Sequence, residues 1–210
     1  MNREQYLHAM GIDVWKEKSL NEVIPEAANE TTWGSLKQKA LTCTLCDLCK
    51  TRKNVVFGSG SLQAKLMVIG EAPGENEDKQ GEPFVGAAGQ LLTKMLKAIG
   101  LERENVYIAN ILKCRPPNNR DPLPHEVEKC TPYLKQQIAF IKPKAILVLG
   151  RIAAHFLLNT DESLTRLRGK DFEYEGIPLI LTYHPAYLLR APAEKRGAYQ
   201  DLLRLQQKLE

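Results

Sequence analysis

Residues 65–70 read KLMVIG and are followed at once by EAPG at residues 71–74. A short apolar run that ends at a segment with glycine and proline is typical of a buried strand entering a loop. Three later runs have the same character: VYIANIL at residues 106–112, AILVLG at 145–150 and LILT at 179–182. The sequence therefore predicts four buried strands.

Helical patterns separate these strands. One apolar stripe with helical spacing ends at Gly100, and a second follows Pro124, a favoured first residue of a helix. Pro132 falls inside the second stripe and predicts a kink or a boundary between two helical pieces. Two further helices are predicted at residues 152–158 and 194–208. Strands that alternate with helices pair in parallel, so we expect an α/β protein with helices on both faces of its sheet.

Polar residues follow three of the predicted strands at the point where each strand ends. Glu71 follows the first strand, Asn110 lies near the end of the second, and His184 follows the fourth. The carboxyl ends of parallel strands meet at one edge of the sheet, and ligands bind there. We therefore expect these three side chains to share one site.

Four of the five cysteines form a split quartet. Two residues separate Cys43 from Cys46, and Cys114 and Cys130 follow much later in the chain. Such spacing is typical of metal ligation, and four-cysteine sites hold either zinc or an iron–sulfur cluster. The spacing alone leaves the metal open. Cys49 is a fifth thiol, and an odd count fits poorly with a fully paired disulfide framework.

Basic residues lie beside both cysteine groups. Arg52 follows the first group, and Lys113 and Arg115 flank Cys114. The formal net charge is +4, although residues 1–34 carry six acidic and three basic side chains. A basic body with an acidic arm is compatible with a polyanionic partner such as nucleic acid, but many ordinary enzymes share this distribution.

Residues 1–34 show little periodicity and predict a flexible, acidic extension ahead of a domain at residues 35–210. The N-terminus lacks the apolar segment of a signal peptide, and no stretch approaches the ~20 apolar residues of a membrane span. We therefore expect an intracellular, cytoplasmic protein. Its cysteines are then expected to serve as thiols or metal ligands rather than as disulfides.

Three loops carry further candidates, each with a plainer alternative. Phe84 lies in a stretch rich in glycine and carboxylates and is either a stacking face for a flat ligand or a core residue. The stretch KCRPPNNRDP at residues 113–122 suits phosphate contacts, but it is equally typical of a solvent-exposed turn. Leu188 and Leu189 lie in a short loop between two prolines and are either core residues or an apolar wedge of the kind that enters base stacks.

Taken together, these segments resemble the family-4 uracil-DNA glycosylases, the iron–sulfur branch of the uracil-DNA glycosylase superfamily. The resemblance covers residues 40–208 and rests on four motifs in this order: CTLCDLCKTRKNVVFGSG, GEAPGENEDKQGEPFVGAAG, YIANILKCRPPNNRDP and HPAYLLR. It implies a three-layer α/β/α sandwich around a four-stranded parallel sheet. It also implies hydrolysis of the bond between uracil and deoxyribose in DNA, which leaves an abasic site.

The resemblance implies a cofactor and a set of DNA contacts. The cofactor is a 4Fe–4S cluster, with Cys49 as an extra thiol, and its ligands are Cys43, Cys46, Cys114 and Cys130. The implied DNA-contacting residues are Arg52, Lys113, Arg115, Leu188, Leu189 and Arg190. The partner is uracil-containing DNA, single- or double-stranded, bound by a monomer that needs no membrane. A replication or repair partner is left unidentified.

The resemblance also implies roles in the pocket. Glu71 would position water, and His184 would donate a hydrogen bond to uracil O2. Asn110 would recognise O4 and N3–H, Phe84 would stack on the base, and Glu77 would lie near C5, where bulk excludes thymine. The remaining implied substrate contacts are Gly70 and Ala72.

Some relatives trap DNA covalently through a histidine in the loop that corresponds to RPPNNRDP. That loop has no histidine here, so turnover is expected. The main alternative function is a non-catalytic nucleic-acid-binding iron–sulfur protein of the same fold. An electron-transfer protein and a zinc-stabilised nucleotide hydrolase are weaker alternatives, the first because electron-transfer proteins group their ligands more compactly.

Overall fold

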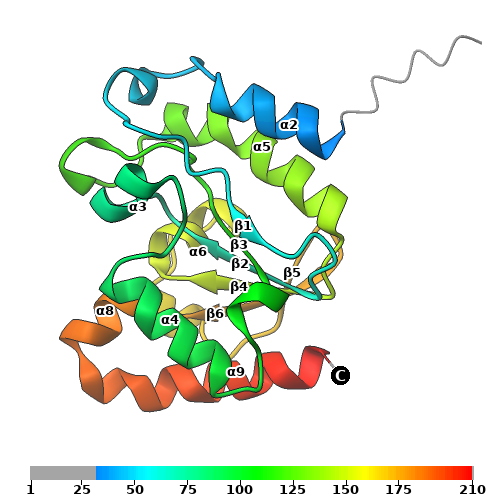
Figure 1. Ribbon diagram of the computed structural model, residues 1–210. Helices are drawn as coiled ribbons and strands as arrows, with labels where there is room; N and C mark the ends of the chain where they lie inside the picture. Colours follow the sequence, from blue (N-terminus) through cyan, green and yellow to red (C-terminus); the bar gives the residue numbers. More distant parts are fainter. Residues whose placement is uncertain (1–31, 210) are drawn as a thin grey trace, which may run out of the picture. The chain divides into compact units, whose positions relative to one another are not determined.

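The computed structural model describes residues 32–209, which fold around one six-stranded sheet (Figure 1). The strand order is β1-β3-β2-β4-β6-β5. Four central strands are parallel and correspond to the four apolar runs: β3 (Tyr107–Asn110), β2 (Leu66–Gly70), β4 (Ala145–Leu149) and β6 (Ile177–Thr182). The predicted parallel sheet is confirmed.

Two short antiparallel strands extend the sheet at its edges and were not predicted. β1 (Ser59–Gly60) pairs with β3, and β5 (Phe172–Tyr174) pairs with β6. β5 reaches β6 through Glu175 and Gly176, which both have positive φ, as two-residue hairpin turns require. Gly60 suits β1 because a Cβ there would lie 1.9 Å from a carbonyl oxygen of the chain entering β3.

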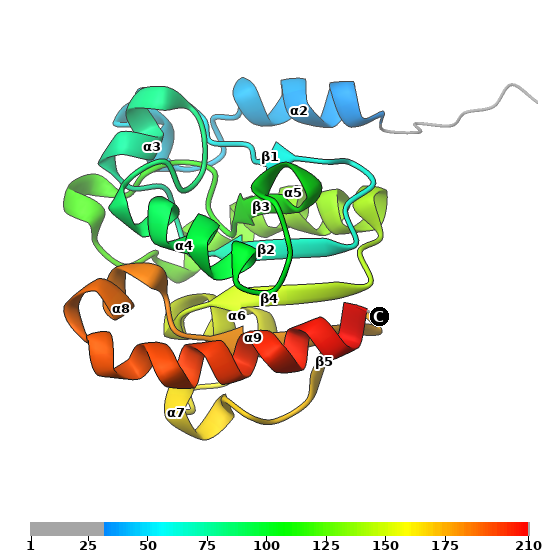
Figure 2. The ribbon, with the colours of Figure 1, turned by 60° about the horizontal axis from the view of Figure 1, so that its bottom comes forward.

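Side chains of the central strands alternate between two core layers. In β2, Leu66 and Val68 face one layer, while Met67 and Ile69 face the other. The helices against the Leu66 layer are α4 (Ala87–Lys97), α8 (Pro185–Arg190) and α9 (Lys195–Leu209). Those against the Met67 layer are α5 (Pro124–Ile141), α6 (Arg151–Leu158) and α7 (Leu164–Leu167). Figure 2 shows α4, α8 and α9 together on one side, which confirms the three-layer sandwich.

The longest predicted helix differs from expectation at one point. The structure continues α5 from Pro124 to Ile141 as a single helix through Pro132, so the interpretation of two separate pieces is wrong. The helix ends at Lys142, which has a left-handed backbone. The remaining short elements are α3 (Glu75–Gln80) and 3₁₀ turns at Asp47–Lys50, Arg103–Asn105, Pro117–Asn119 and Pro192–Glu194.

The N-terminal boundary of the folded part lies slightly earlier than predicted. α2 (Trp33–Leu41) starts after Thr32, whose hydroxyl accepts a hydrogen bond from the backbone N–H of Ser35 at 3.2 Å. The predicted extension at residues 1–34 therefore overlaps the first turn of α2. Residues 1–31 lie outside the described part, so their predicted flexibility is not tested. Among the described helices, none combines the length and the apolar character that a membrane span needs.

Candidate active site and cysteine pocket

The ends of β2, β3 and β6 bring the predicted pocket residues together. A Cβ on Gly70 would lie 2.4 Å from Asn110 Oδ1 and 2.7 Å from Phe84 Cζ. A glycine at this position therefore lets both side chains lie directly against the backbone at the end of β2. The rings of Phe84 and His184 have centroids 5.7 Å apart. Four residues from three separate motifs therefore lie close together at the carboxyl edge of the sheet.

Asn110 is the most constrained polar residue of this group. It is 1% exposed, and its Oδ1 has no hydrogen-bond partner within residues 32–209. Buried polar atoms are almost always paired, because an unpaired one costs about 1–3 kcal/mol. An orphaned amide oxygen beside an aromatic face is thus an acceptor suited to a ligand N–H.

His184 is held as a neutral ring with a defined tautomer. The backbone N–H of Ala186 donates to its Nδ1 at 3.2 Å, which places the ring proton on Nε2. Burial, with Arg190 nearby as the next cause, lowers the pKa of His184 to about 4. Near neutral pH the ring is therefore uncharged and offers Nε2–H as a hydrogen-bond donor.

Glu71 has an unusual ionisation. Burial raises its pKa to about 7, the Asp121 carboxylate adds to this effect, and Arg151 opposes it. The carboxyl is therefore poised near neutral pH, as a group that handles water or a developing charge requires. The sequence did not single out Asp121 or Arg151, because they come from another loop and from the first residue of α6.

Phe84 is presented by a strained loop. Its φ is 53°, in the left-handed region that non-glycine residues rarely adopt. Gly89 makes room for this turn, since a Cβ there would lie 1.7 Å from the Phe84 carbonyl oxygen. Arg103 donates from Nη2 to the carbonyl of Pro83. Phe84 is a buried core residue, as one of its two interpretations expects, and its ring lies beside that of His184. Its role as a stacking face for a flat ligand stays a prediction.

Glu77 has a contact that the sequence did not predict. Its Oε1 accepts hydrogen bonds from the backbone N–H groups of Val85 at 2.9 Å and Gly86 at 3.0 Å. These bonds fix the loop between Phe84 and α4. The carboxylate therefore stabilises the Phe84 loop directly. Its predicted position near uracil C5 stays a prediction. Ala72, another predicted contact, is half-buried and packs against the core layer that contains Met67.

The two adjacent leucines of the last motif differ in burial. The predicted loop is the short helix α8, in which Leu188 is 1% exposed and Leu189 is 45% exposed. Leu188 belongs to the core layer with α4 and α9, so its predicted role as a DNA wedge is wrong. Leu189 and the neighbouring Arg190 remain exposed at the edge that carries His184.

Lys113 also contradicts its predicted role. Its side chain is 2% exposed, and its Nζ donates to the carbonyl of Asn110 at 2.7 Å and to Gln137 Oε1 at 2.6 Å. A phosphate cannot reach this ammonium. Arg115, by contrast, lies half-buried in the same loop, where its Nε donates to Asn119 Oδ1 at 2.7 Å.

A buried carboxylate of α5 binds the basic loop at residues 113–122. Glu126 accepts two hydrogen bonds from the Arg120 guanidinium, at 2.9 and 2.6 Å, and one from the Leu123 N–H at 2.9 Å. The ion pair to Arg120 and burial act on Glu126 in opposite directions, and the ion pair prevails and lowers its pKa. Glu126 was not predicted as a contact, although its place in the first turn after Pro124 is typical of a capping residue.

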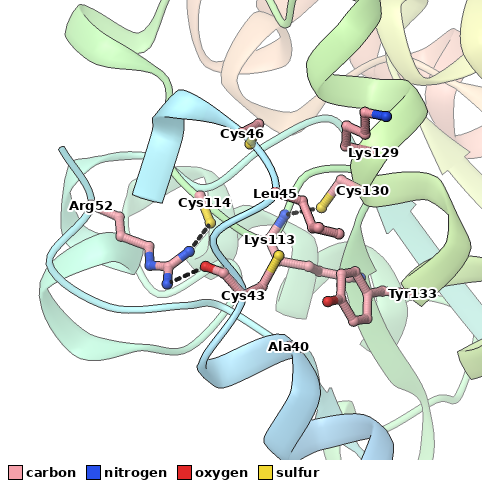
Figure 3. A pocket seen from close by; sticks show the side chains of 10 residues that line it. All are labelled: Ala40, Cys43, Leu45, Cys46, Arg52, Lys113, Cys114, Lys129, Cys130 and Tyr133. Atoms are coloured by element: carbon pink, nitrogen blue, oxygen red, sulfur yellow. Dashed lines mark hydrogen bonds between the residues drawn. The ribbon is translucent and has the colours of Figure 1, made fainter. Parts of the chain in front are cut away.

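The cysteine quartet lines one pocket (Figure 3). Cys43 and Cys46 come from the segment after α2, Cys114 from the loop after β3, and Cys130 from α5. Cys49 is not among the residues that line this pocket. Within residues 32–209, no three Cys, His, Asp or Glu side chains converge closely enough to hold a single metal ion.

Hydrogen-bond donors surround the thiols of this pocket. Arg52 donates from Nη1 to Cys114 Sγ at 3.1 Å and from Nη2 to the Cys43 carbonyl at 2.7 Å. The backbone N–H of Lys113 donates to Cys130 Sγ at 3.2 Å. Burial raises the pKa of the Cys130 thiol to about 11, which Lys113 opposes. Both terminal nitrogens of Arg52 therefore donate to atoms of the pocket cysteines. They are not free to bind a DNA phosphate, as the predicted role of Arg52 requires.

Comparison with known proteins identifies the family. Residues 57–204 match the profile described as Uracil DNA glycosylase superfamily. The type-4 uracil-DNA glycosylase of Archaeoglobus fulgidus is 51% identical over 172 residues, which cover 78% of this chain and 86% of the relative. That of Sulfurisphaera tokodaii is 45% identical over 82% of each chain, and that of Thermotoga maritima is 46% identical over 74% of this chain and 82% of its own. The chain therefore belongs to the uracil-DNA glycosylase superfamily, within its type-4 branch.

Proposed function

We propose that the protein is a DNA repair glycosylase that hydrolyses the bond between uracil and deoxyribose and leaves an abasic site. Membership of the type-4 branch supports this activity. The observation that carries it is the orphaned, buried Asn110 Oδ1 close to Phe84, whose ring in turn lies beside that of His184. A base inside a duplex cannot reach a buried atom of this kind, so the nucleotide must be flipped out of the stack first.

Asn110 reads the base by complementarity. Its Oδ1 accepts from uracil N3–H, and its Nδ2 donates to uracil O4. Cytosine has no N3–H and carries an amino group where uracil has O4, so it would leave both ends of a buried amide mismatched. Sites that hydrogen-bond their ligand reject such analogues strongly, because unpaired buried groups are costly. Phe84 supplies the stacking face.

His184 stabilises the leaving group. Its Nε2–H donates to uracil O2, where negative charge develops as the glycosidic bond breaks. A neutral ring serves as this donor, and the donor Ala186 N–H keeps the required tautomer in place. A donor fixed in advance at the position of developing charge needs no reorganisation during the reaction.

Glu71 positions the attacking water and offsets positive charge on the sugar. Only the ionised carboxylate can do either. Because burial raises its pKa to about 7, a large share of Glu71 is ionised at neutral pH while the site stays poorly solvated. The water and the sugar carbon then meet on the face opposite the departing base.

Leu189 and Arg190 contact the DNA around the flipped nucleotide. Leu189 is exposed at the tip of α8, where it can fill the vacated place in the base stack, and Arg190 follows it towards the phosphates. Arg115 supplies a further phosphate contact. We propose uracil-containing DNA, single- or double-stranded, as the partner of an intracellular monomer that turns over without trapping its substrate.

The four pocket cysteines fit a 4Fe–4S cluster better than a zinc ion. Tetrahedral zinc would draw four sulfur atoms to within roughly 3.7 Å of each other, given Zn–S bonds of about 2.3 Å. The described cysteines share a pocket without converging on one ion, as a larger group requires. When bound, the cluster supplies a structural cross-link between three chain segments. Arg52 and Lys113 offset the negative charge of its thiolate ligands.

The direct test is incubation with a uracil-containing oligonucleotide, followed by alkaline cleavage of abasic sites. We expect strand breaks at uracil and none at thymine or cytosine in the same position. Binding without any cleavage, from a preparation that contains its full complement of iron, would favour the non-catalytic alternative.

A further inference from the structure

Lys113 links the cysteine pocket to the strand that reads the base. Its backbone N–H donates to Cys130 Sγ at 3.2 Å, while its side-chain Nζ donates to the Asn110 carbonyl at 2.7 Å. The side chain is among the largest that are fully buried. One residue therefore contacts both a thiol of the quartet and the backbone of the residue that recognises uracil.

The position of this ammonium is fixed from the far side. Gln137 of α5 accepts from Lys113 Nζ at 2.6 Å. Its own Nε2 donates to the Phe57 carbonyl at 2.8 Å and to Tyr107 Oη at 3.2 Å. Gln137 is 0% exposed, so its amide cannot turn to water. The ammonium is therefore held at a defined point between α5 and the end of β3.

The bond to Asn110 fixes one peptide group at both ends. The carbonyl of Asn110 accepts from Lys113, and the next N–H, that of Ile111, donates to the Gly70 carbonyl at 3.0 Å. A planar peptide group with its oxygen and its nitrogen both anchored cannot rotate. Its orientation determines the direction in which the Asn110 side chain leaves the backbone.

The charge of Lys113 also needs compensation. An ammonium in the interior is costly unless opposite charge lies close to it. Its two side-chain hydrogen bonds go to neutral oxygens, whereas the thiols of Cys114, the next residue, and Cys130, which accepts from the Lys113 N–H, line the same pocket as Lys113. Thiolates at these positions would supply the missing negative charge.

We propose that Lys113 is a positioning residue that couples the cysteine site to uracil recognition. The negative charge of the thiolates stabilises the ammonium, and the ammonium holds the peptide group that aims Asn110. This inference rests on the proposed function, since it assigns Asn110 to the base and thiolate ligands to the quartet.

The test compares two neutral variants at the same pocket. Lys113→Met removes the ammonium and its bond to Asn110. Lys129→Met also removes a positive charge from the lining of the cysteine pocket, but Lys129 is exposed and has no bond to β3. Affinity for free uracil is measured by ligand-observed NMR titration, which involves no catalysis and does not depend on turnover. Iron content and affinity for a uracil-free single strand are measured on the same samples.

Lys113→Met is expected to weaken uracil binding about tenfold or more, with little change in affinity for the uracil-free strand. Lys129→Met is expected to bind uracil as the unchanged protein does. Lys113→Arg, which keeps the charge and its donors, should recover part of the loss. If the Met variant does not fold, Lys113→Gln is compared in its place, because its shorter side chain cannot span to the Asn110 carbonyl.

Two results would overturn the coupling. One is a folded Lys113→Met protein that binds uracil normally, and the other is an equal loss in Lys129→Met. Failure of the proposed function looks different, because then the unchanged protein itself would neither bind free uracil nor cleave uracil-containing DNA.

Discussion

The rings of Phe84 and His184 face each other with an interplanar angle of 32°. They arrive from distant parts of the chain, one from the loop before α4 and the other from the end of β6. Both are held by their backbones, Phe84 by its left-handed turn and His184 by the Pro185 that follows it and starts α8. A site whose walls are fixed before its ligand arrives loses little free energy in ordering them.

Removing the Asn110 amide should strongly weaken recognition of the base. Asn110→Ala deletes two hydrogen bonds to the base, each worth about 1.5 kcal/mol, so kcat/KM for uracil excision should fall about 100-fold or more. Single-turnover assays on a uracil-containing single strand measure this. Asn105→Ala, at an exposed asparagine of the 3₁₀ turn before β3, is the matched control and should behave normally. Comparable loss in both variants would contradict the assignment.

The pH dependence of excision should follow Glu71. Because its pKa is raised to about 7, the reactive carboxylate is lost as pH falls below 7, and the rate should decrease there. His184, with a pKa lowered to about 4, stays neutral throughout and adds no inflection between pH 5 and 9. Glu71→Gln should give a low rate without the inflection near pH 7. A wild-type profile that is flat from pH 5 to 9 would refute this role.

The same carboxyl should cost stability at alkaline pH. Its folded pKa of about 7 lies above the ordinary value of 4.5, so the protonated form is favoured by folding. The penalty for burying the charged form is absent below pH 4.5 and complete above pH 7. Glu71→Gln should therefore stabilise the protein by about 1–3 kcal/mol at pH 8 and much less at pH 5. Denaturant titrations at both values measure the difference.

Arg103 should affect catalysis through the Phe84 loop. Arg103→Met removes the donor to the Pro83 carbonyl, which lets the strained turn relax and displaces the stacking face. We expect excision to slow by about tenfold, with partial rescue by Arg103→Lys, since one charge-assisted hydrogen bond contributes roughly 1.5 kcal/mol. Arg166→Met, at an exposed arginine of α7, is the control. An Arg103→Met enzyme with normal kcat and KM would exclude the role.

The two adjacent leucines should have opposite phenotypes. Leu188→Ala empties a buried core position and should lower stability by about 2–5 kcal/mol. Leu189→Ala removes an exposed side chain, so its melting temperature should barely change while excision from duplex DNA drops. Thermal melting and parallel assays on duplex and single strands separate the two effects. Interchanged phenotypes would show that the assignment of buried and exposed leucine is wrong.

Cysteine substitutions should distinguish the quartet from the extra thiol. Cys114→Ser removes a pocket thiol whose sulfur accepts a hydrogen bond from Arg52, so bound iron and stability should both fall. Cys49→Ser changes a thiol outside the lining of the pocket and should retain iron. Iron analysis and visible absorbance of purified protein provide the measurements. Normal iron in Cys114→Ser, or its loss in Cys49→Ser, would require a different ligand set.

The features that the sequence predicted are those with a local signal. The four central strands are buried on both faces and so read as continuous apolar runs. The ends of three of these runs marked Glu71, Asn110 and His184 as candidate site residues. β1 and β5 were not predicted because they are only two and three residues long, too short to show a pattern in the sequence. They are defined by their pairing with β3 and β6.

The errors arose where tertiary contacts decide the environment. Lys113 looks like a basic residue of an exposed loop, but Gln137, far along the chain in α5, draws it into the interior. Leu188 and Leu189 have the same local sequence context, and only the docking of α8 onto α4 separates a buried from an exposed side chain. The pKa of Glu71 likewise depends on burial and on Asp121, which no local pattern reveals.

The Glu126 carboxylate ties the loop at residues 113–122 to the start of α5, so the two segments would have to be transferred together to another protein. Arg120 and the Leu123 N–H both bind it, so the loop takes its shape from a residue that lies beyond its own sequence. Anyone who grafts this loop onto another scaffold, or swaps it between homologues, would have to carry Glu126 with it. A chimera cut at Pro122 would join a foreign helix to a loop in which Arg120 had lost the buried carboxylate that binds it.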